Sequence, residues 1–545
     1  MNSPWTLQSN VPTRIYERPL GLTELGFYWD CQFNGTADTL QHAIVEVLDS
    51  KHQHLFSIEN VTRTWVALKQ RFPLLGSRLA ERRKGGDMVF VIAEDRLGYC
   101  GPGEMSMQDA SSLAEAEALA DSAVNGERLL SNELLARIVI LRRTDQINQV
   151  HVLIHVAHCI TDGIANASIL RCFLDMLSSE NGPGKWDLEE RLALAASSED
   201  LAPGRQLNQA RHRWQYAIGK TIASNRLARL KGGHSLPRRF TQLTPFRPAR
   251  SAHTTTSFST EESKRIIQTC RAYGMTFGVA LPVLAQVALT RVLCRRYLSG
   301  DIDKNEWEYR RKEPMTTGGP LNLRPFLDRS WYERGGIGDV SLKIGFFFRT
   351  LPFMPLGSAS KLAPGDTLPD VQDMLSLPRF LLRCRSVQQQ ANRLVNHPLF
   401  LHISTARSQA SISRLKVVVS QWKNKLEQAA DHDIPVPDQG LVLSHGGSSM
   451  GNLDHLIPLD YPLSRTPGTA PILHLLKSGT QLHCRPGELY LGASTTRQQL
   501  HLFIHWDKNV YDEETVKEWL QEVRSATECY LGGLEHVNTR GKARL

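Results

Sequence analysis

The sequence predicts an α/β protein built from two domains. Its 545 residues exceed what one ordinary hydrophobic core holds, so two large domains are expected. Strand-like and helix-like patterns occur in both halves, which favours mixed sheets covered by helices. Residues 203–250 contain Pro and Gly and have the composition of a long connection. We therefore predict domains at residues 1–202 and 251–545, joined by a basic crossover linker at 203–250.

The first half contains a helix and several strands. Residues 58–71 carry apolar side chains at helical spacing, and Pro73 ends that helix. The predicted strands are residues 87–93, 135–142 and 149–156. The last of these alternates Val and Ile with other residues, as a strand with one buried face does.

The second half opens with a capping-box pattern at residues 259–262, which predicts the start of a helix. A second helix is predicted at residues 277–295 with Thr276 as its N-cap, and Pro282 must sit in an early turn or cause a kink. Asp512 is the expected N-cap of a last helix. Strands are predicted at residues 340–348, 440–444 and 500–506.

A histidine with the right surroundings for proton transfer follows strand 149–156 directly, in the stretch His158-Cys159-Ile160-Thr161-Asp162-Gly163. Histidine is the natural proton acceptor near neutral pH, so we predict His158 as a general base. Asp162 can fold back and fix the loop as structural support. Gly163 is expected to permit a turn that other residues resist.

This H-x-x-x-D-G pattern after a strand resembles the superfamily with the chloramphenicol acetyltransferase fold. Its members include plant BAHD acyltransferases, fungal trichothecene and alcohol O-acetyltransferases, and peptide-synthetase condensation domains. Collinear segments extend the resemblance over most of the chain: residues 18–24 (RPLGLTE), 72–79 (FPLLGSRL), 322–324 (NLR) and 448–451 (SSMG). It implies two chloramphenicol acetyltransferase-like domains, each a mixed sheet with helices, and a tunnel between them.

Two departures narrow the resemblance. Ala157 precedes His158 where a condensation domain has a second histidine, and the BAHD signature DFGWG is absent. The fungal trichothecene and alcohol O-acetyltransferases are therefore the most similar group.

The resemblance also suggests roles for other residues. Arg324 is expected to pair with Asp162, and Ser448 or Ser449, in a Gly-rich loop, to donate a hydrogen bond to the reaction's oxyanion. Single residues of these types are often only structural, which is how we interpret His151 and His155.

The implied activity is transfer of an acyl group, with acetyl preferred, from an acyl-CoA thioester to a hydroxyl or amine of a small-molecule acceptor, a secondary metabolite. Acyl-CoA (acetyl-CoA) is then a co-substrate, with no bound cofactor and no metal. Two alternatives stay open. One is a condensation-type enzyme whose donor is bound to a separate carrier protein; the other is a catalytically silent small-molecule-binding protein of the same fold.

The charge is uneven along the chain. Residues 203–250 hold 11 Lys or Arg and no acidic residue, so the rest of the chain has 64 − 11 = 53 basic against 55 acidic residues. The segment is either a solvated linker or a region that attracts an anionic partner. No nucleic-acid-binding module is recognised, so no nucleic-acid partner is expected.

The remaining composition favours a cytoplasmic protein. The nine cysteines include no C-x-x-C pair, which suits reduced thiols. No run of 18 or more apolar residues predicts a membrane span, and the N-terminus lacks a secretory pattern.

Overall fold

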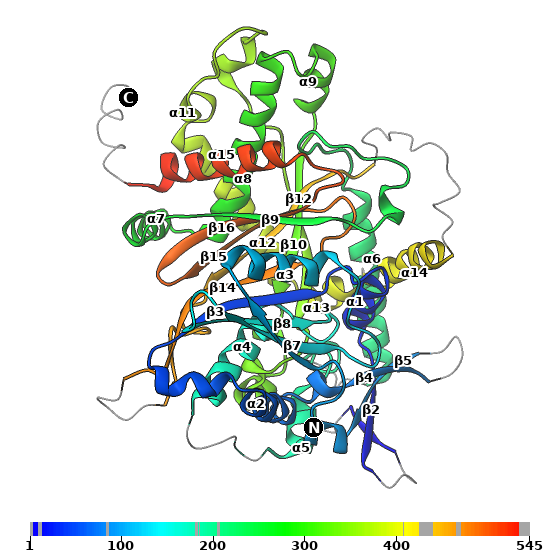
Figure 1. The fold of residues 1–545 in the computed structure, drawn as a ribbon. Helices are drawn as coiled ribbons and strands as arrows, with labels where there is room; N and C mark the ends of the chain where they lie inside the picture. Colours follow the sequence, from blue (N-terminus) through cyan, green and yellow to red (C-terminus); the bar gives the residue numbers. More distant parts are fainter. Residues whose placement is uncertain are drawn as a thin grey trace.

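The computed structural model describes residues 4–8, 13–82, 87–179, 184, 186–203, 208–406, 408–424, 440–464 and 470–533. Within them the chain forms fifteen α-helices and three β-sheets (Figure 1). The two six-stranded sheets lie one above the other in this view, and α8 and α15 cover the outer side of the upper sheet. The predicted α/β class with mixed sheets is confirmed.

The strand orders are β1-β2-β5-β4, β13-β14-β3-β8-β7-β6 and β11-β10-β12-β15-β16-β9. The strands are β1 (Thr6–Leu7), β2 (Ile15–Pro19), β3 (Thr39–Val47), β4 (Arg78–Glu81), β5 (Met88–Ala93), β6 (Met105–Ala110), β7 (Ala136–Arg143), β8 (Gln149–Val156), β9 (Ser251–Ser257), β10 (Met315–Asn322), β11 (Ile344–Leu351), β12 (Leu443–Asn452), β13 (Asp460–Tyr461), β14 (Leu473–Leu482), β15 (Leu489–Thr496) and β16 (Gln499–Asp507).

The helices are α1 (Leu22–Gln32), α2 (Ile58–Arg71), α3 (Leu113–Asn125), α4 (Gly163–Ser178), α5 (Leu188–Leu194), α6 (Gln209–Ala228), α7 (Thr260–Ala272), α8 (Phe277–Leu298), α9 (Lys304–Arg310), α10 (Arg329–Glu333), α11 (Val371–Met374), α12 (Leu377–Val395), α13 (Phe400–Ala406), α14 (Ser408–Lys423) and α15 (Glu513–Leu531).

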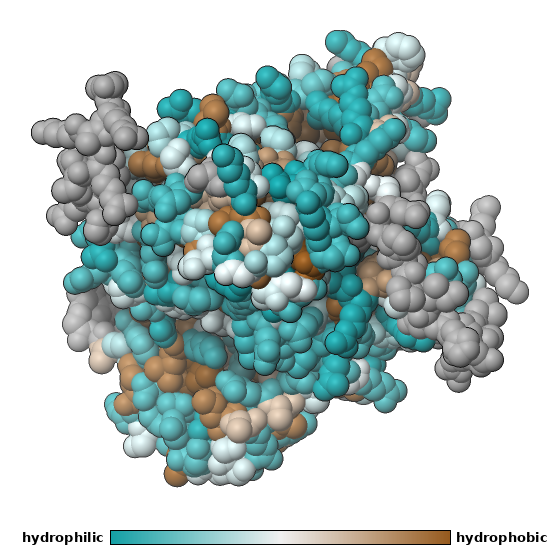
Figure 2. All heavy atoms as spheres, turned by 90° about the horizontal axis from the view of Figure 1, so that it is seen from above, coloured by the Kyte–Doolittle hydropathy of each residue, from teal (hydrophilic) through white to brown (hydrophobic). Residues whose placement is uncertain are grey.

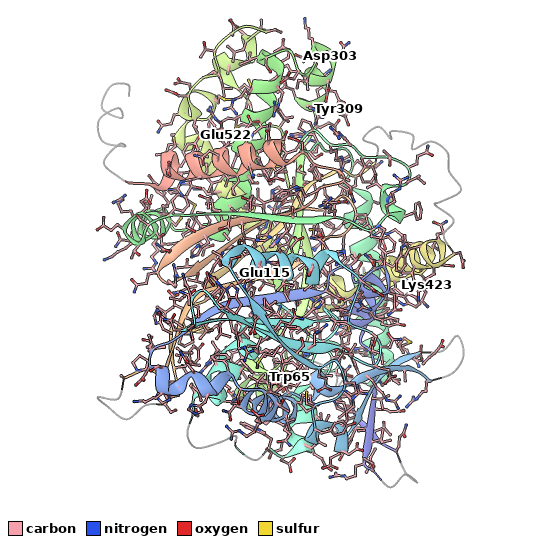
Figure 3. All side chains as sticks on the ribbon, in the orientation of Figure 1. Trp65, Glu115, Asp303, Tyr309, Lys423 and Glu522 are labelled. Carbon is pink, nitrogen blue, oxygen red and sulfur yellow. The ribbon has the colours of Figure 1, made fainter. Side chains whose placement is uncertain are left out.

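Helix α2 follows the sequence prediction residue for residue. The Ser57 hydroxyl accepts a hydrogen bond from the Asn60 amide (3.3 Å) and caps its first turn. Trp65 is fully buried and donates from its indole N–H to Glu104 (3.3 Å), so the helix is fixed against the lower sheet (Figure 3). Strand β8 pairs with β3 and β7, and its side chains are buried on both faces, not on one as its alternating pattern predicted.

The second core is organised around α8. It packs against α15, where Glu522 receives hydrogen bonds from Arg291 (2.6 Å) and Arg295 (Figure 3). By length and composition alone, an 18-residue window of α8 is apolar enough to cross a membrane. That window is 83% buried inside the protein, as expected for a core helix.

The two sheets do not follow the predicted division of the chain. Strands β13 and β14 come from the second half, yet β14 pairs with β3 along its whole length and extends the lower sheet. A boundary at residue 250 therefore separates chain segments but not structural units, because sheet pairing between distant segments leaves no mark in local composition.

The described residues of the segment 203–250 pack against other elements, which a solvated linker would not do. They include α6, which packs on α13, and Ser235 and Leu236 are buried against the upper core. The Ser235 carbonyl accepts from Arg310 (2.8 Å), and the Arg239 amide donates to the Val510 carbonyl (2.9 Å). The solvated-linker interpretation is wrong for the part beyond α6. Residues 204–207 lie outside the described residues.

Candidate active site

His158 stands at the exit of β8, in the turn that leads into α4. Its Nδ1 donates a hydrogen bond to the Thr161 carbonyl (2.7 Å). A carbonyl oxygen only accepts, so Nδ1 carries the hydrogen and the neutral ring has its lone pair on Nε2. The residue as a whole is partly buried. The turn thus holds His158 in the tautomer that can take a proton at Nε2.

Phe27 of α1 supports the imidazole. The two rings stack with centroids 4.0 Å apart and planes at 22°. Burial lowers the pKa of His158 below the usual histidine value, and the nearby Arg485 guanidinium acts in the same direction. His158 is therefore neutral, and able to act as a base, at neutral pH.

Asp162 is buried and fully engaged. Its Oδ1 caps α4 by accepting from the amides of Ile164 (3.1 Å) and Ala165 (3.0 Å). Its Oδ2 accepts from Arg324 and from the Lys343 amide, both at 2.8 Å. Burial alone would raise the pKa of this carboxyl, but the Arg324 guanidinium and these amides outweigh it and lower the pKa. The expected contact between Asp162 and Arg324 is present and joins the histidine turn to the segment after β10.

Gly163 does not make the kind of turn that was predicted for it. It is the first residue of α4, and its φ lies outside the left-handed region. A Cβ at this position would lie 2.6 Å from Cε of Met450 in β12. Glycine here leaves room for the tip of the Met450 side chain, a flexible group, and its backbone does not use the left-handed region that glycine favours.

Ser448 and Ser449 lie on strand β12, not in a loop as predicted. Paired residues of neighbouring strands point to the same face of a sheet. Ser448 pairs with Gly492, and its hydroxyl donates to the Pro320 carbonyl (3.4 Å). Pro320 pairs with Phe346, whose ring centroid lies 6.2 Å from that of Phe27. The face that carries Ser448 is therefore the one toward Phe27 and His158.

Ser449 points to the opposite face. Its Cβ lies 3.1 Å from where a Cβ would stand on Gly278, near the start of α8. Met450, two residues beyond Ser448, reaches Gly163 on the site's face. Of the two predicted serines, only Ser448 is directed toward the face shared with the histidine turn.

A cavity of about 530 Å³ lies elsewhere, between the start of α1, residues 197–202 and helices α6 and α13. Neither His158 nor Ser448 lines it, so its size says nothing about the reaction. Among the described residues, no cluster of three or more His, Cys, Asp or Glu side chains is arranged to hold a metal ion.

Sequence reasoning missed Phe27 and Arg485. Phe27 is one aromatic residue among several in the stretch FYW of α1, and Arg485 lies in the turn before β15. Nothing in their local spacing marks either one, because their relation to His158 arises only when three distant segments come together.

No family model matches the chain, and no curated protein matches it in sequence. Several solved structures share its fold. The trichothecene 15-O-acetyltransferase TRI3 from Fusarium sporotrichioides aligns over 97% of this chain and 98% of its own, with a TM-score of 0.68 and 13% identity. The condensation domain of the monacolin K polyketide synthase MokA aligns over 96% of this chain and 98% of its own, with a TM-score of 0.57 and 10% identity. The first condensation domain of the calcium-dependent antibiotic synthetase aligns over 96% of this chain and 97% of its own, with a TM-score of 0.56 and 12% identity. At these identities the likeness shows the two-domain fold that condensation domains and this acetyltransferase share.

Proposed function

We propose that this protein is an acyltransferase that moves an acyl group, preferably acetyl, from acyl-CoA to a hydroxyl or amine of a small secondary metabolite. The observation that carries the proposal is His158, held as a neutral base whose hydrogen bond to Thr161 leaves the lone pair on Nε2, in a turn whose Gly163 meets Met450 of β12. The shared fold with a trichothecene 15-O-acetyltransferase supports the fungal O-acetyltransferase type. Nine free thiols suit a cytoplasmic location.

The reaction proceeds without a covalent acyl-enzyme. His158 Nε2 takes the proton of the acceptor hydroxyl as its oxygen attacks the thioester carbonyl. The resulting oxyanion accepts a hydrogen bond from the Ser448 hydroxyl, which turns away from the Pro320 carbonyl to give it. When the tetrahedral intermediate collapses, the C–S bond breaks and His158 returns its proton to the leaving thiolate.

The test is acyl transfer by the purified protein and by His158→Ala. Incubation with labelled acetyl-CoA and a fungal metabolite extract, followed by mass spectrometry, identifies the acetylated product. His158→Ala should fold normally and lose about 10²–10⁴-fold in kcat/KM, because it lacks the general base. The ascending limb of the wild-type pH profile should lie below about pH 6.5 and vanish in the variant.

Other outcomes separate the alternatives. Transfer only from an acyl group attached to a carrier protein would identify a condensation-type enzyme. Binding of acetyl-CoA or of an acceptor without turnover from either donor would identify a silent binding protein. Near-normal turnover by His158→Ala would place the base elsewhere.

A further inference from the structure

Phe27 connects the proposed base to a positive charge on another part of the chain. Its ring stacks on His158 at 4.0 Å, and the guanidinium carbon of Arg485 lies 5.4 Å from the same ring centroid. Phe27 itself is 4% exposed, so this contact is made in the protein interior. Histidine, phenylalanine and arginine come from three segments: the turn after β8, helix α1, and the turn between β14 and β15.

Two carboxylates hold Arg485 in this place. Asp30, one turn after Phe27 on α1, accepts from Arg485 at 2.7 Å. Glu488 accepts from the Arg485 amide (2.8 Å) and lies 3.4 Å from its guanidinium. Helix α1 therefore supplies both the ring that covers His158 and the carboxylate that anchors the guanidinium. A shift of α1 would disturb ring and charge together.

We infer that Phe27 and Arg485 are positioning residues that fix the His158 ring and keep it in its uncharged, proton-accepting form. The stacked ring limits rotation of the imidazole, and the hydrogen bond from Nδ1 to the Thr161 carbonyl limits it as well. The guanidinium disfavours a second positive charge nearby. The part of this inference that concerns acyl transfer rests on the proposed function. The part that concerns the charge state of His158 does not depend on it.

Three carboxylates also influence the charge state of His158. Asp162 favours the imidazolium, but its charge is balanced by Arg324 at 2.8 Å. Asp30 and Glu488 act through Arg485, because they partly neutralise it. Removing the positive charge and removing a negative charge should therefore move the pKa of His158 in opposite directions. Removing Arg485 should raise the pKa of His158, and removing the Asp30 charge should lower it, because Arg485 is then less neutralised.

The test is a titration of His158 by NMR in the full-length protein, labelled with ¹³C at histidine Cε1 and assigned with His158→Gln. In Arg485→Met the midpoint should move up by about half a pH unit or more, and in Asp30→Asn it should move down. Arg329→Met, which removes an exposed arginine of α10 paired with Glu333, is the matched control and should leave it unchanged.

The same variants are then followed through the pH profile of kcat/KM, whose ascending limb should shift in the same directions. Phe27→Leu should lower kcat at least several-fold at its own pH optimum while KM changes little, because the ring is no longer held. Unchanged midpoints in both charge variants, or shifts of the same sign, would overturn the inference even if acyl transfer is found. Opposite NMR shifts in a protein without acyl transfer would uphold the charge balance and reject the proposed function.

Discussion

At the scale of single residues, the site depends on buried groups that satisfy one another. Asp162 uses both carboxylate oxygens: one caps α4 and the other meets Arg324 and the Lys343 amide. Arg324 is 1% exposed and also donates to the Ser341 carbonyl (3.1 Å). Each group would be costly to bury alone, so the turn that carries His158 has one stable arrangement.

Asp162→Ala should lower the free energy of unfolding by about 3–5 kcal/mol, because it leaves the Arg324 guanidinium buried without its carboxylate. Asp162→Asn should cost less, since an amide oxygen can still cap α4. The measurement is urea unfolding. Asp303→Ala is the control: Asp303 is an exposed N-cap that accepts from the Glu306 amide (2.8 Å) at the far end of the molecule (Figure 3), and about 1 kcal/mol is expected. Equal losses in the two alanine variants would contradict the role given to the buried pair.

At the scale of elements, several helices and strands follow from local pattern alone. The helix predicted at residues 58–71 and the strand predicted at 149–156 match α2 and β8, because capping, periodicity and Pro73 act within a few residues. Strand β12 does not follow from local pattern alone. It was predicted to end at residue 444 and runs to Asn452, because pairing with β10 and β15 keeps Gly446 and Gly447 in the sheet.

The two faces of β12 give a matched pair of variants. Ser448→Ala should lower kcat by about 10²–10³-fold if its hydroxyl stabilises the oxyanion. Ser449→Ala should leave kcat within about twofold, because Ser449 faces α8. Steady-state kinetics with acetyl-CoA and the acceptor identified by mass spectrometry measures both. A larger loss in Ser449→Ala would mean that the catalytic face of the strand has been wrongly assigned.

At the scale of the whole molecule, histidines of the two large sheets lie near one another, and two of them, His151 and His505, are buried. His42 of β3 and His151 of β8 are hydrogen-bonded at 2.9 Å, and His253 of β9 lies beside His505 of β16, with ring centroids 6.2 Å apart. Burial, together with the charges of His151, Lys477 and His253, lowers the pKa of His42 to about 3. The face of the molecule seen in Figure 2 is mainly hydrophilic, with hydrophobic residues gathered toward the lower left.

The stability of the protein should therefore fall in acid. Burial lowers the pKa of His505 to about 3, so between about pH 6.5 and 3 the unfolded chain binds a proton there that the folded protein does not. Each such histidine removes about 1.4 kcal/mol per pH unit as the pH falls through this window. Urea unfolding at pH 7 and pH 5 should show a smaller loss for His505→Gln than for the wild type. His54→Gln, at an exposed position, should lose as much as the wild type. An equal loss in His505→Gln would exclude His505 from the effect.

The sequence alone determined the α/β class, the elements with strong local signals and the position of His158 directly after β8. It also led, through resemblance, to the pairing of Asp162 with Arg324. Only the tertiary structure decided which serine of β12 faces the histidine turn, that Met450 packs against residue 163, and that Phe27 and Arg485 meet at His158. The tertiary structure also decided that β14, from the second half of the chain, pairs with β3 in the sheet of the first half. The reason is physical: caps and periodicity act over a few neighbouring residues, whereas sheet pairing and side-chain packing join segments hundreds of residues apart.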